Sequence, residues 1–564
     1  MNNQANQSNE KFTKQEAYFI EPFFTNVDKN VFAAKYLPSE VLGALASRYS
    51  RSKKGVRRLF FDEYIKPILE PNLEGADRKS IREAGIMRKE LVSFVGYLHE
   101  HGGWEAVVNS RRARDFFARW LAAYGDDSIA QMAGAHLFLE NISIVATKYL
   151  EDFRIGFAPL EKSTRYVRFD EKIGGRWIYF IDPNLAKSKY GRDYIRLLNL
   201  LFSRYSKSIE PLLKYLKRKY PQEKDQSVRA YAETMNAKTY DVLRTYLPSA
   251  TLTNVGFFGV GQAFEYVITK CLASPLVEIR NLAKEAQVEL KKVIPSMVER
   301  ATSVRGRVYQ RYVQSTEKNL EKLTQKLGFR VQGSGFSEPA VQLVEYDLDA
   351  EVKIIASLLY KYSNLPASEI KRRVGKLTTK QRLEIIKTST SRRQVRQHRL
   401  LRAFENTYYK FDIVANLGAY RDLHRHRMLT QERQRFTTEL GYDVPFDLTS
   451  AKLDAPYIDA AKKIDNFYRK ISQKYPEQAQ YVVMLGNRIR WYQWENLREL
   501  GWEAELRTGP QGHPDYRVIE QEKIRLVARV HPTLVKVLKF VDFSEYDLAR
   551  RESEKKIDKK LGIT

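Results

Sequence analysis

The densest group of polar side chains lies between Arg421 and Phe436, in the run RDLHRHRMLTQERQRF. It contains five arginines and two histidines: Arg421, Arg425, Arg427, Arg433, Arg435, His424 and His426. Guanidinium groups donate paired hydrogen bonds and stay charged, so this run suits a phosphate, a carboxylate or the polar edge of a ring. A solvated basic helix end has the same composition, so composition alone leaves both interpretations open.

A metal site is not favoured. His424 and His426 would diverge on a helix, and the chain has one cysteine, Cys271. A single cysteine excludes an intramolecular disulfide and a zinc site with several cysteines.

A second group is Glu161-Lys162-Ser163-Thr164-Arg165-Tyr166. A hydroxyl, a guanidinium and a phenol within one loop can surround a phosphate or a pyrimidine edge, although a surface turn has the same residues.

A third group is Arg244-Thr-Tyr-Leu247-Pro248, with Thr253 five residues past the proline, and an ordinary helix end is its alternative. In a fourth, Asn496, Arg498 and Arg507 lie at i, i+2 and i+11. Eleven residues make about three helical turns, so Asn496 and Arg507 share a face and can line a groove. A solvated polar face is again the alternative.

Two further patterns are weaker. Arg392, Arg396 and Arg399 form a helical stripe that can bind phosphates or remain an exposed basic face. Gly259-Val260-Gly261 lacks the third glycine of a dinucleotide fingerprint.

The elements that would position these residues are mostly helical. Apolar spacings of three and four predict helices over 127–151, 397–417 and 457–485, and an amphipathic helix over 408–423 leads into the arginine-rich run. The strand candidates are 176–181 and 341–346. Gly, Ser and Pro gather between 328 and 339. We therefore expect a first domain at 1–310, a linker at 311–340 and a second domain at 341–564.

Composition sets the wider limits. The chain has 564 residues, 43% hydrophobic and 29% charged, which is a globular composition. Its net charge of +28 favours anionic partners. No apolar stretch approaches the length of a transmembrane helix, and the polar start lacks a signal peptide's apolar core, so a cytoplasmic protein without membrane contact is expected.

Together the four groups resemble the flavin-dependent thymidylate synthase family, present as two fused and divergent copies. That family carries Arg-His-Arg at a helix end, then a loop with Glu, Ser and Arg-Tyr. Further along it has Arg-x-x-Leu-Pro with a Thr five residues past the Pro, and an Asn-x-Arg helix that ends in Leu-Arg. The resemblance covers about 125–290 and 395–530. It implies an α+β, helix-rich fold of two tandem domains forming a pseudo-dimer.

The second half retains Arg425-His426-Arg427, Asn496, Arg498 and Leu506-Arg507. Its loop is about two residues short and lacks the Ser, although Arg435-Phe436 can stand for Arg-Tyr. Its Arg-x-x-Leu-Pro is replaced by the region Gln480 to Leu485, and His398 is the nearest candidate for the family's Gly-His-x-Ser element.

The first half shows the opposite pattern. Arg154-Ile155-Gly156 keeps only the first Arg of Arg-His-Arg, and Asp126 replaces the His of Gly-His-x-Ser. Glu161, Ser163, Arg165 and Tyr166 match the loop, and Arg244, Leu247, Pro248 and Thr253 match the next element. The Asn-x-Arg helix is lost around Gly261 to Lys270.

The resemblance implies an enzyme that methylates dUMP to dTMP with FAD, methylenetetrahydrofolate and NADPH, as a homo-oligomer of the fused chain. It implies no catalytic nucleophile on the protein. The residues implied to bind the cofactor are Arg425, His426, Arg427, Asn496, Arg498, His398 and Glu161. Those implied to bind the substrate are Ser163, Arg165, Tyr166, Arg244, Arg435, Arg507 and Arg154.

Because the features missing from one half are present in the other, the two halves could build one composite site. The alternatives are a non-catalytic flavin- or nucleotide-binding descendant and a basic nucleic-acid-binding protein. The last predicts aromatic residues interleaved with a basic groove, and no such module is evident.

Overall fold

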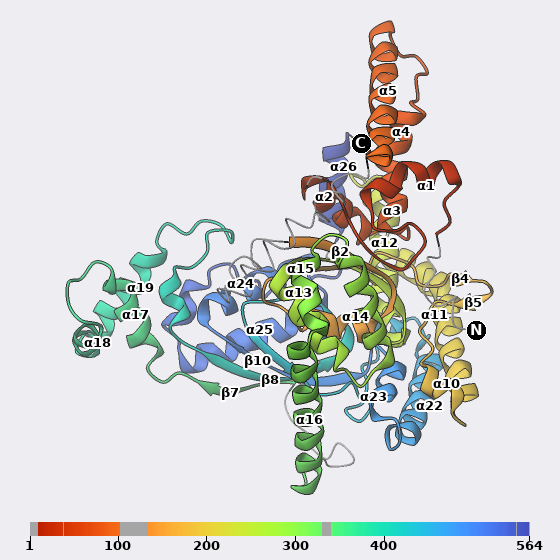
Figure 1. The fold of residues 1–564 in the computed structure, drawn as a ribbon. Coiled ribbons are helices and arrows are strands. Elements are labelled where there is room, and N and C mark those ends of the chain that lie inside the picture. Colours follow the sequence, from red (N-terminus) through yellow and green to blue (C-terminus); the bar gives the residue numbers. More distant parts are fainter. Residues whose placement is uncertain (1–9, 38, 102–133, 330–339, 549, 563–564) are drawn as a thin grey trace. The chain divides into compact units, whose positions relative to one another are not determined.

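A computed structural model describes residues 10–37, 39–101, 134–329, 340–548 and 550–562 (Figure 1). The chain divides into two compact units. Unit 1 contains residues 1–202, 249–332 and 474–481, and unit 2 contains 203–248, 333–473 and 482–564. The units therefore differ from the two sequence halves, because residues 203–248 of the first half belong to unit 2.

Unit 1 is built on a four-stranded antiparallel sheet of order β1-β2-β6-β3. Its strands are β1 (Val31–Ala33), β2 (Gly134–Ser143), β6 (Leu252–Val260) and β3 (Phe157–Glu161). A bulge interrupts β2 between Leu139 and Ile142, where Asn141 takes a positive φ of 55°. A short hairpin, β4 (Lys172–Ile173) and β5 (Arg176–Trp177), stands apart from this sheet.

Unit 2 has a four-stranded antiparallel sheet of the same form, with order β7-β8-β10-β9. Its strands are β7 (Val341–Tyr346), β8 (Tyr409–Asn416), β10 (Arg488–Glu495) and β9 (Thr430–Arg433). In β8 the residues Tyr409, Phe411 and Ile413 are fully buried and their neighbours are less so, which is the alternation of a strand with one face in the core.

The two sheets also share their register. Ser143 ends β2, caps the helix that follows and pairs with Leu252. Asn416 ends β8, caps the helix that follows and pairs with Arg488. These pairs make Ser143 equivalent to Asn416 and Leu252 equivalent to Arg488, so the structure contains the same strand–helix core twice.

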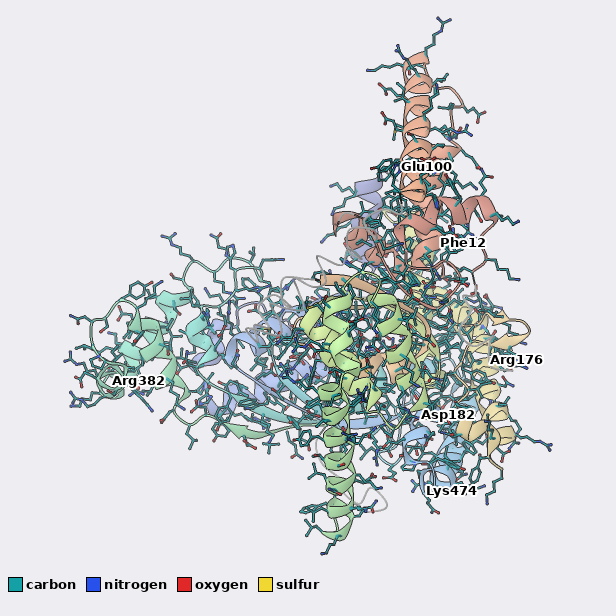
Figure 2. All side chains as sticks on the ribbon, viewed as in Figure 1. Phe12, Glu100, Arg176, Asp182, Arg382 and Lys474 are labelled. Atoms are coloured by element: carbon teal, nitrogen blue, oxygen red, sulfur yellow. The ribbon has the colours of Figure 1, made fainter. Side chains whose placement is uncertain are left out.

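The helices of unit 1 lie before, between and after its strands in the sequence. They are α1 (Lys14–Ile20), α2 (Ser39–Tyr49), α3 (Val56–Phe60), α4 (Lys66–Leu69), α5 (Arg78–Glu100), α9 (Ile144–Glu151), α10 (Pro183–Lys187), α13 (Gly261–Leu272), α14 (Val277–Leu290), α15 (Pro295–Val298), α16 (Val304–Lys326) and α23 (Pro476–Ala479). Asp182, labelled in Figure 2, caps α10 by accepting hydrogen bonds from the backbone N–H groups of Asn184 and Leu185.

The remaining helices belong to unit 2, except that α11 passes from one unit to the other. They are α11 (Gly191–Lys219), α12 (Val228–Leu243), α17 (Ala350–Tyr360), α18 (Ala367–Gly375), α19 (Thr379–Thr390), α20 (Leu417–Leu423), α21 (Phe446–Ser450), α22 (Asp454–Ser472), α24 (Leu497–Arg507), α25 (Pro514–Val530) and α26 (Arg551–Leu561). Short turns of 3-10 helix include η3 (Arg244–Tyr246), η4 (Glu299–Thr302), η5 (Arg402–Glu405) and η6 (Gln480–Val482).

Several predicted elements were wrong. The predicted helix 127–151 is strand β2 followed by α9, and its first residues lie outside the described ones. The predicted helices 397–417 and 408–423 contain strand β8. In both places a strand runs directly into a capped helix, and the two apolar patterns together imitate one long helical pattern.

Other predictions were partly right. Strand 341–346 is confirmed as β7, whereas the second strand candidate forms a strand only at 176–177, with Tyr179 in an isolated bridge to Thr251. The predicted helix 457–485 ends at Ser472, and two short helical turns follow. Residues 391–400 form turns, so the arginine stripe at 392, 396 and 399 is not helical. The α+β, helix-rich fold class is confirmed. Among the described helices, none has the length and hydropathy that crossing a membrane requires.

Candidate functional site

The Arg-His-Arg run of unit 2 follows α20, and a cap and a strand fix its position. The Asn416 side chain accepts a hydrogen bond from Ala419 N at 2.8 Å, and its amide donates to Asp515 at 2.7 Å and Asp443 at 2.9 Å. After the helix, Gln431 of β9 donates to the backbone oxygens of Leu423 and His426, both at 3.3 Å. The turn that carries Arg425, His426 and Arg427 is therefore held at both ends.

His426 and Arg507 meet directly. Nε of Arg507 donates to Nε2 of His426 at 2.8 Å, although the two residues are 81 positions apart in sequence. Because Nε2 accepts, the neutral imidazole carries its proton on Nδ1, which lies 3.4 Å from Oε1 of Glu499. The histidine ring is thus fixed between a carboxylate and a guanidinium.

A buried ionic cluster lies behind this pair. Lys523 Nζ is 2.7 Å from Glu495, and 3.2 Å from both Glu503 and Glu520, and all four side chains are fully buried. Glu503 in turn lies 3.9 Å from His426. Burial raises the pKa of Glu520 to about 8, with the charge of Glu503 adding to the effect and Lys523 opposing it.

Glu503 behaves differently within the same cluster. Burial opposes its ionisation, but the adjacent imidazole of His426 and the charges of Lys523 and Arg507 outweigh burial and lower its pKa. Glu503 therefore stays ionised. It lies one helical turn before Arg507 on α24.

Arg244 reaches the same helix α20 from the first half of the sequence. It is 3% exposed, and its Nη1 donates to Oδ2 of Asp422 at 3.3 Å. Its Nη2 is buried and has no hydrogen-bond partner among the described residues. Gly418 permits this approach, since an added Cβ would lie 3.3 Å from Arg244 Nε and 3.4 Å from its Cζ.

A buried guanidinium nitrogen without a partner is costly, so it is typical of a site that receives an anion. Asp422 and His426 are four residues apart on the segment that Arg244 and Arg507 contact. Unit 2 thus places Arg244 and Arg507 against the segment that carries Arg425, His426 and Arg427, and Arg427 and the neighbouring Met428 are exposed.

Other predicted residues of the second half have structural contacts. Asn496 caps α24 by accepting from Glu499 N at 2.9 Å. Arg498 donates to Leu400 O at 2.8 Å and forms an ion pair with Glu405, away from His426. His398 is exposed in a turn and accepts a hydrogen bond from Gln394 N at 3.3 Å.

Arg435 is half-buried after β9, and Phe436 is fully buried in the core. Phe436, which the resemblance matched to the Tyr of the family's Arg-Tyr pair, therefore supplies packing.

The Ser163 loop belongs to unit 1. Ser163 N donates to Ser50 O at 2.9 Å, and Ser163 Oγ accepts from Arg165 N at 3.2 Å. Tyr166 is 41% exposed and lies under the guanidinium of Arg51, 5.2 Å from its ring centre.

Glu161 does not line an open site. It is 1% exposed and pairs with Lys148 at 3.1 Å, and Lys148 also pairs with Glu151. All three side chains are buried, so unit 1 fills the end of α9 with its own ion pairs.

Because Ser143 and Asn416 are equivalent caps, residues at the same distance from them in the two halves are also equivalent. Arg154 lies eleven residues after Ser143, as Arg427 does after Asn416. Arg154 is therefore equivalent to Arg427 and not to Arg425. Counting back from Leu252 and Arg488 likewise makes Gln480 the equivalent of Arg244.

Glu499, Glu503 and Lys523 were missed by the sequence reasoning. Glu499 and Glu503 lie three and seven residues after Asn496, in phase with Arg507, so helical periodicity could have found them. Nothing in the sequence signals Lys523. Within the described part of the chain, no three His, Cys, Asp or Glu side chains are grouped to hold a metal ion.

Comparison with protein families gives two matches to one model, described as thymidylate synthase complementing protein, at residues 87–296 and 342–533. The chain belongs to this family. The two matches confirm the two divergent copies that the sequence predicted, and they agree with the repeated sheet.

Relatives of this family member include two UPF0159 proteins. That of Chlamydia pneumoniae is 38% identical over 547 residues, covering 97% of this chain and 98% of the relative. That of Thermoplasma acidophilum is 31% identical over 479 residues, covering 80% of this chain and 94% of the relative. Among solved structures, the UMP/dUMP methylase PolB of Streptomyces cacaoi bound with 5-Br dUMP is similar, with a TM-score of 0.28 and 16% identity, covering 36% of this chain and 95% of that one.

Proposed function

We propose that this protein is an FAD-dependent thymidylate synthase that methylates dUMP to dTMP. In this reaction the methylene carbon of methylenetetrahydrofolate passes to the pyrimidine, and NADPH supplies the reducing equivalents, giving dTMP, tetrahydrofolate and NADP⁺. The membership of both halves in the thymidylate synthase complementing protein family is the observation that carries the proposal.

The side chains of unit 2 fit anionic ligands. Arg244 has a buried Nη2 without a partner in the described structure, and Arg507 is aligned by the neutral ring of His426. We assign the nucleotide to Arg244 and Arg507, because a guanidinium aligned before binding loses less entropy when the ligand arrives.

Flavin binding is assigned to the run that follows α20. Arg425, His426 and Arg427 would hold it, and the flavin, when bound, supplies the hydride. His426 keeps Arg507 oriented, and Oε1 of Glu499 lies 3.4 Å from Nδ1 of the ring. The roles of Ser163, Arg165 and Tyr166 in nucleotide binding, and of a homo-oligomer, stay predictions from the family resemblance.

The second candidate is a non-catalytic binding protein of the same family. It is favoured by unit 1, where Lys148, Glu151 and Glu161 pair with one another in the core. A nucleic-acid-binding role rests only on the charge of +28.

The test has two steps. Visible absorbance of the purified full-length chain reports bound flavin, and conversion of dUMP to dTMP is then followed with methylenetetrahydrofolate and NADPH. Flavin with dTMP formation supports the proposal. Flavin without turnover supports the non-catalytic candidate, and absence of both, with tight salt-dependent binding of nucleic acid, supports the third.

A further inference from the structure

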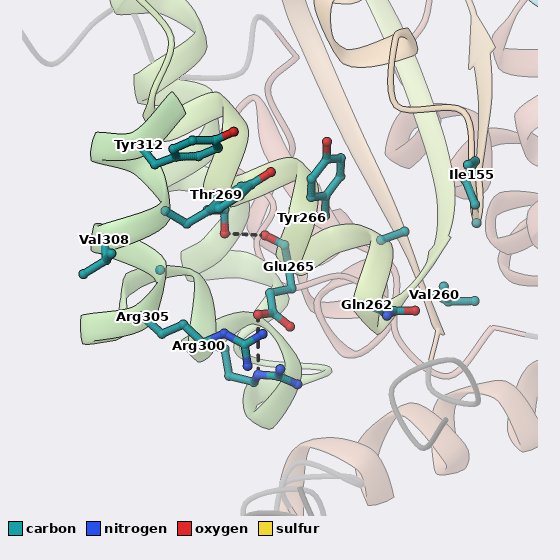
Figure 3. A pocket seen from close by; sticks show the side chains of 14 residues that line it. Ile155, Val260, Gln262, Glu265, Tyr266, Thr269, Arg300, Arg305, Val308 and Tyr312 are labelled. Atoms are coloured by element: carbon teal, nitrogen blue, oxygen red, sulfur yellow. Dashed lines mark hydrogen bonds and ion pairs between the residues drawn. The ribbon is translucent and has the colours of Figure 1, made fainter. Parts of the chain in front are cut away.

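A pocket of about 1160 Å³ opens in unit 1, between α13 and the first turns of α16 (Figure 3). It exceeds the roughly 300–1,000 Å³ typical of small-molecule sites. Much of it is formed beyond residue 296, where the family match of the first half ends. We propose that this pocket binds a planar aromatic ligand that carries a phosphate or carboxylate group.

Three tyrosines supply the aromatic surface. Tyr266 comes from α13, and Tyr309 and Tyr312 come from α16. Tyr309 and Tyr312 have ring centres 6.0 Å apart, and Tyr266 and Tyr312 are 47% and 62% exposed. In Figure 3 Tyr266 and Tyr312 point into the same space. Exposed rings that face one space offer stacking surfaces and hydroxyl groups to a flat ligand.

Arginines supply the charge. Arg300 lies 3.4 Å from Glu265 and is neutralised by it. Arg305 is exposed and has no hydrogen bond or ion pair among the described residues, so its guanidinium is available to a phosphate or carboxylate. The lining charges therefore leave one positive charge for an anion.

The pocket wall is fixed by close packing. A Cβ on Gly306 would lie 2.2 Å from the carbonyl oxygen of Ala301, so only glycine lets α16 begin against η4. Gln310 donates to Ala301 O at 2.9 Å and Gln314 to Ala273 O at 3.4 Å. These contacts hold Arg305, Tyr309 and Tyr312 at the mouth before any ligand binds.

The equivalent face of unit 2 is filled by the protein itself. Trp502 lies six residues after the cap of α24, as Tyr266 does after the cap of α13. The guanidinium groups of Arg399 and Arg396 lie 4.6 and 5.1 Å from the Trp502 ring centre. An aromatic face at this position of the fold therefore does stack with a flat charged group, and in unit 1 that space is a pocket.

The inference does not depend on the proposed function. Its test is titration calorimetry of the full-length chain with FMN, folic acid and dUMP as anionic probes, and riboflavin as the uncharged counterpart of FMN. We expect Arg305→Ala to weaken the binding of at least one anionic probe about ten-fold, because one charge-assisted hydrogen bond is lost. Riboflavin affinity should be unchanged in this variant.

Arg311→Ala is the matched control, since Arg311 is an exposed arginine of α16 that does not line the pocket. Tyr312→Ala is a second variant at an exposed position. It should weaken the binding of riboflavin as well as that of FMN, because both ligands would stack on this ring. The inference is overturned if Arg305→Ala binds every anionic probe as the wild type does, or if Arg311→Ala weakens binding equally. Loss of dTMP formation alone would bear on the proposed function and not on this pocket.

Discussion

Arg507 donates from Nε to Nε2 of His426 at 2.8 Å, and so joins the end of α24 to the Arg-His-Arg turn that follows α20. Asn496 and Arg507 were predicted to share a helical face, but Asn496 is used as the cap of α24. The face of α24 that carries Arg507 contributes Glu499 and Glu503 to the site instead of Asn496. The basic cluster is thus organised around one neutral imidazole.

The first prediction concerns this pair. Arg507→Ala and His426→Ala should each weaken dUMP binding, and the double variant should lose less than the sum. Residues in direct contact show coupling energies of about 0.5–3 kcal/mol in such cycles. Titration of dUMP into the four proteins measures the coupling. Additive losses would contradict a shared role.

The second prediction concerns flavin retention. Arg427 is exposed beside the fixed turn, and losing a hydrogen bond to a charged group costs about 1.5–3 kcal/mol. Arg427→Ala should therefore lower the flavin content of the purified protein, read from its visible absorbance. Arg402→Ala is the control, because the Arg402 side chain is 86% exposed on η5. Equal flavin content in both variants would remove Arg427 from the cofactor site.

The sequence predicted the repeated domain and the basic cluster more accurately than the elements that carry them. Arginines at fixed spacing are visible without a structure, and the resemblance to the family was drawn in part from them. The boundary between β8 and α20 was hidden, because Ile413 and Leu417 continue a spacing that also suits a helix. Cap residues such as Asn416 mark that boundary, but Asn is common in loops as well.

The passage of Arg244 into unit 2 could not be predicted from local patterns. The residues around Arg244 have the pattern of an ordinary helix end. Its contact with Asp422 joins residues that are 178 positions apart in the sequence. The resemblance suggested complementary halves, which stays a prediction; unit 2 does include residues 203–248 of the first half. The Lys523 cluster also escaped prediction, because its glutamates come from separate elements.

The third prediction tests the packing of α16. Gly306→Ala places a Cβ against the backbone of Ala301, which cannot move aside as a side chain can. Overpacking of this kind costs about 1–3 kcal/mol, so the thermal midpoint should fall. Gly85→Ala in α5 is the control, since no atom lies within 4 Å of the added Cβ. That change should leave stability equal or raise it by about 0.5–1 kcal/mol.

The fourth prediction is a pH dependence. Burial raises the pKa of Glu278 to about 7, although Ser143 and Tyr481 donate hydrogen bonds to it. A carboxyl whose folded pKa is raised stabilises the fold below its ordinary pKa of 4.5, and this contribution is lost as the pH rises to about 7. The loss amounts to roughly 3 kcal/mol.

Glu278→Gln removes the titrating proton and keeps the shape of the side chain. Urea unfolding at pH 5, 6, 7 and 8 should show a weaker fall in stability for the variant than for the wild type. The same slope in both proteins would show that Glu278 does not titrate in this range.

The last prediction concerns the number of nucleotide sites. Unit 2 contains both Arg244 and Arg507. In the equivalent positions, counted from the strand registers, Gln480 replaces Arg244 and Cys271 replaces Arg507, and Cys271 is 1% exposed. A glutamine and a buried thiol cannot supply the two fixed charges that a phosphate and a pyrimidine edge need. We therefore expect one dUMP per chain, with binding weakened in Arg244→Ala and also in Arg507→Ala while the circular dichroism spectrum stays unchanged. Titration calorimetry gives this stoichiometry directly. Two nucleotides per chain, with one surviving in each variant, would show that unit 1 binds dUMP through residues other than these.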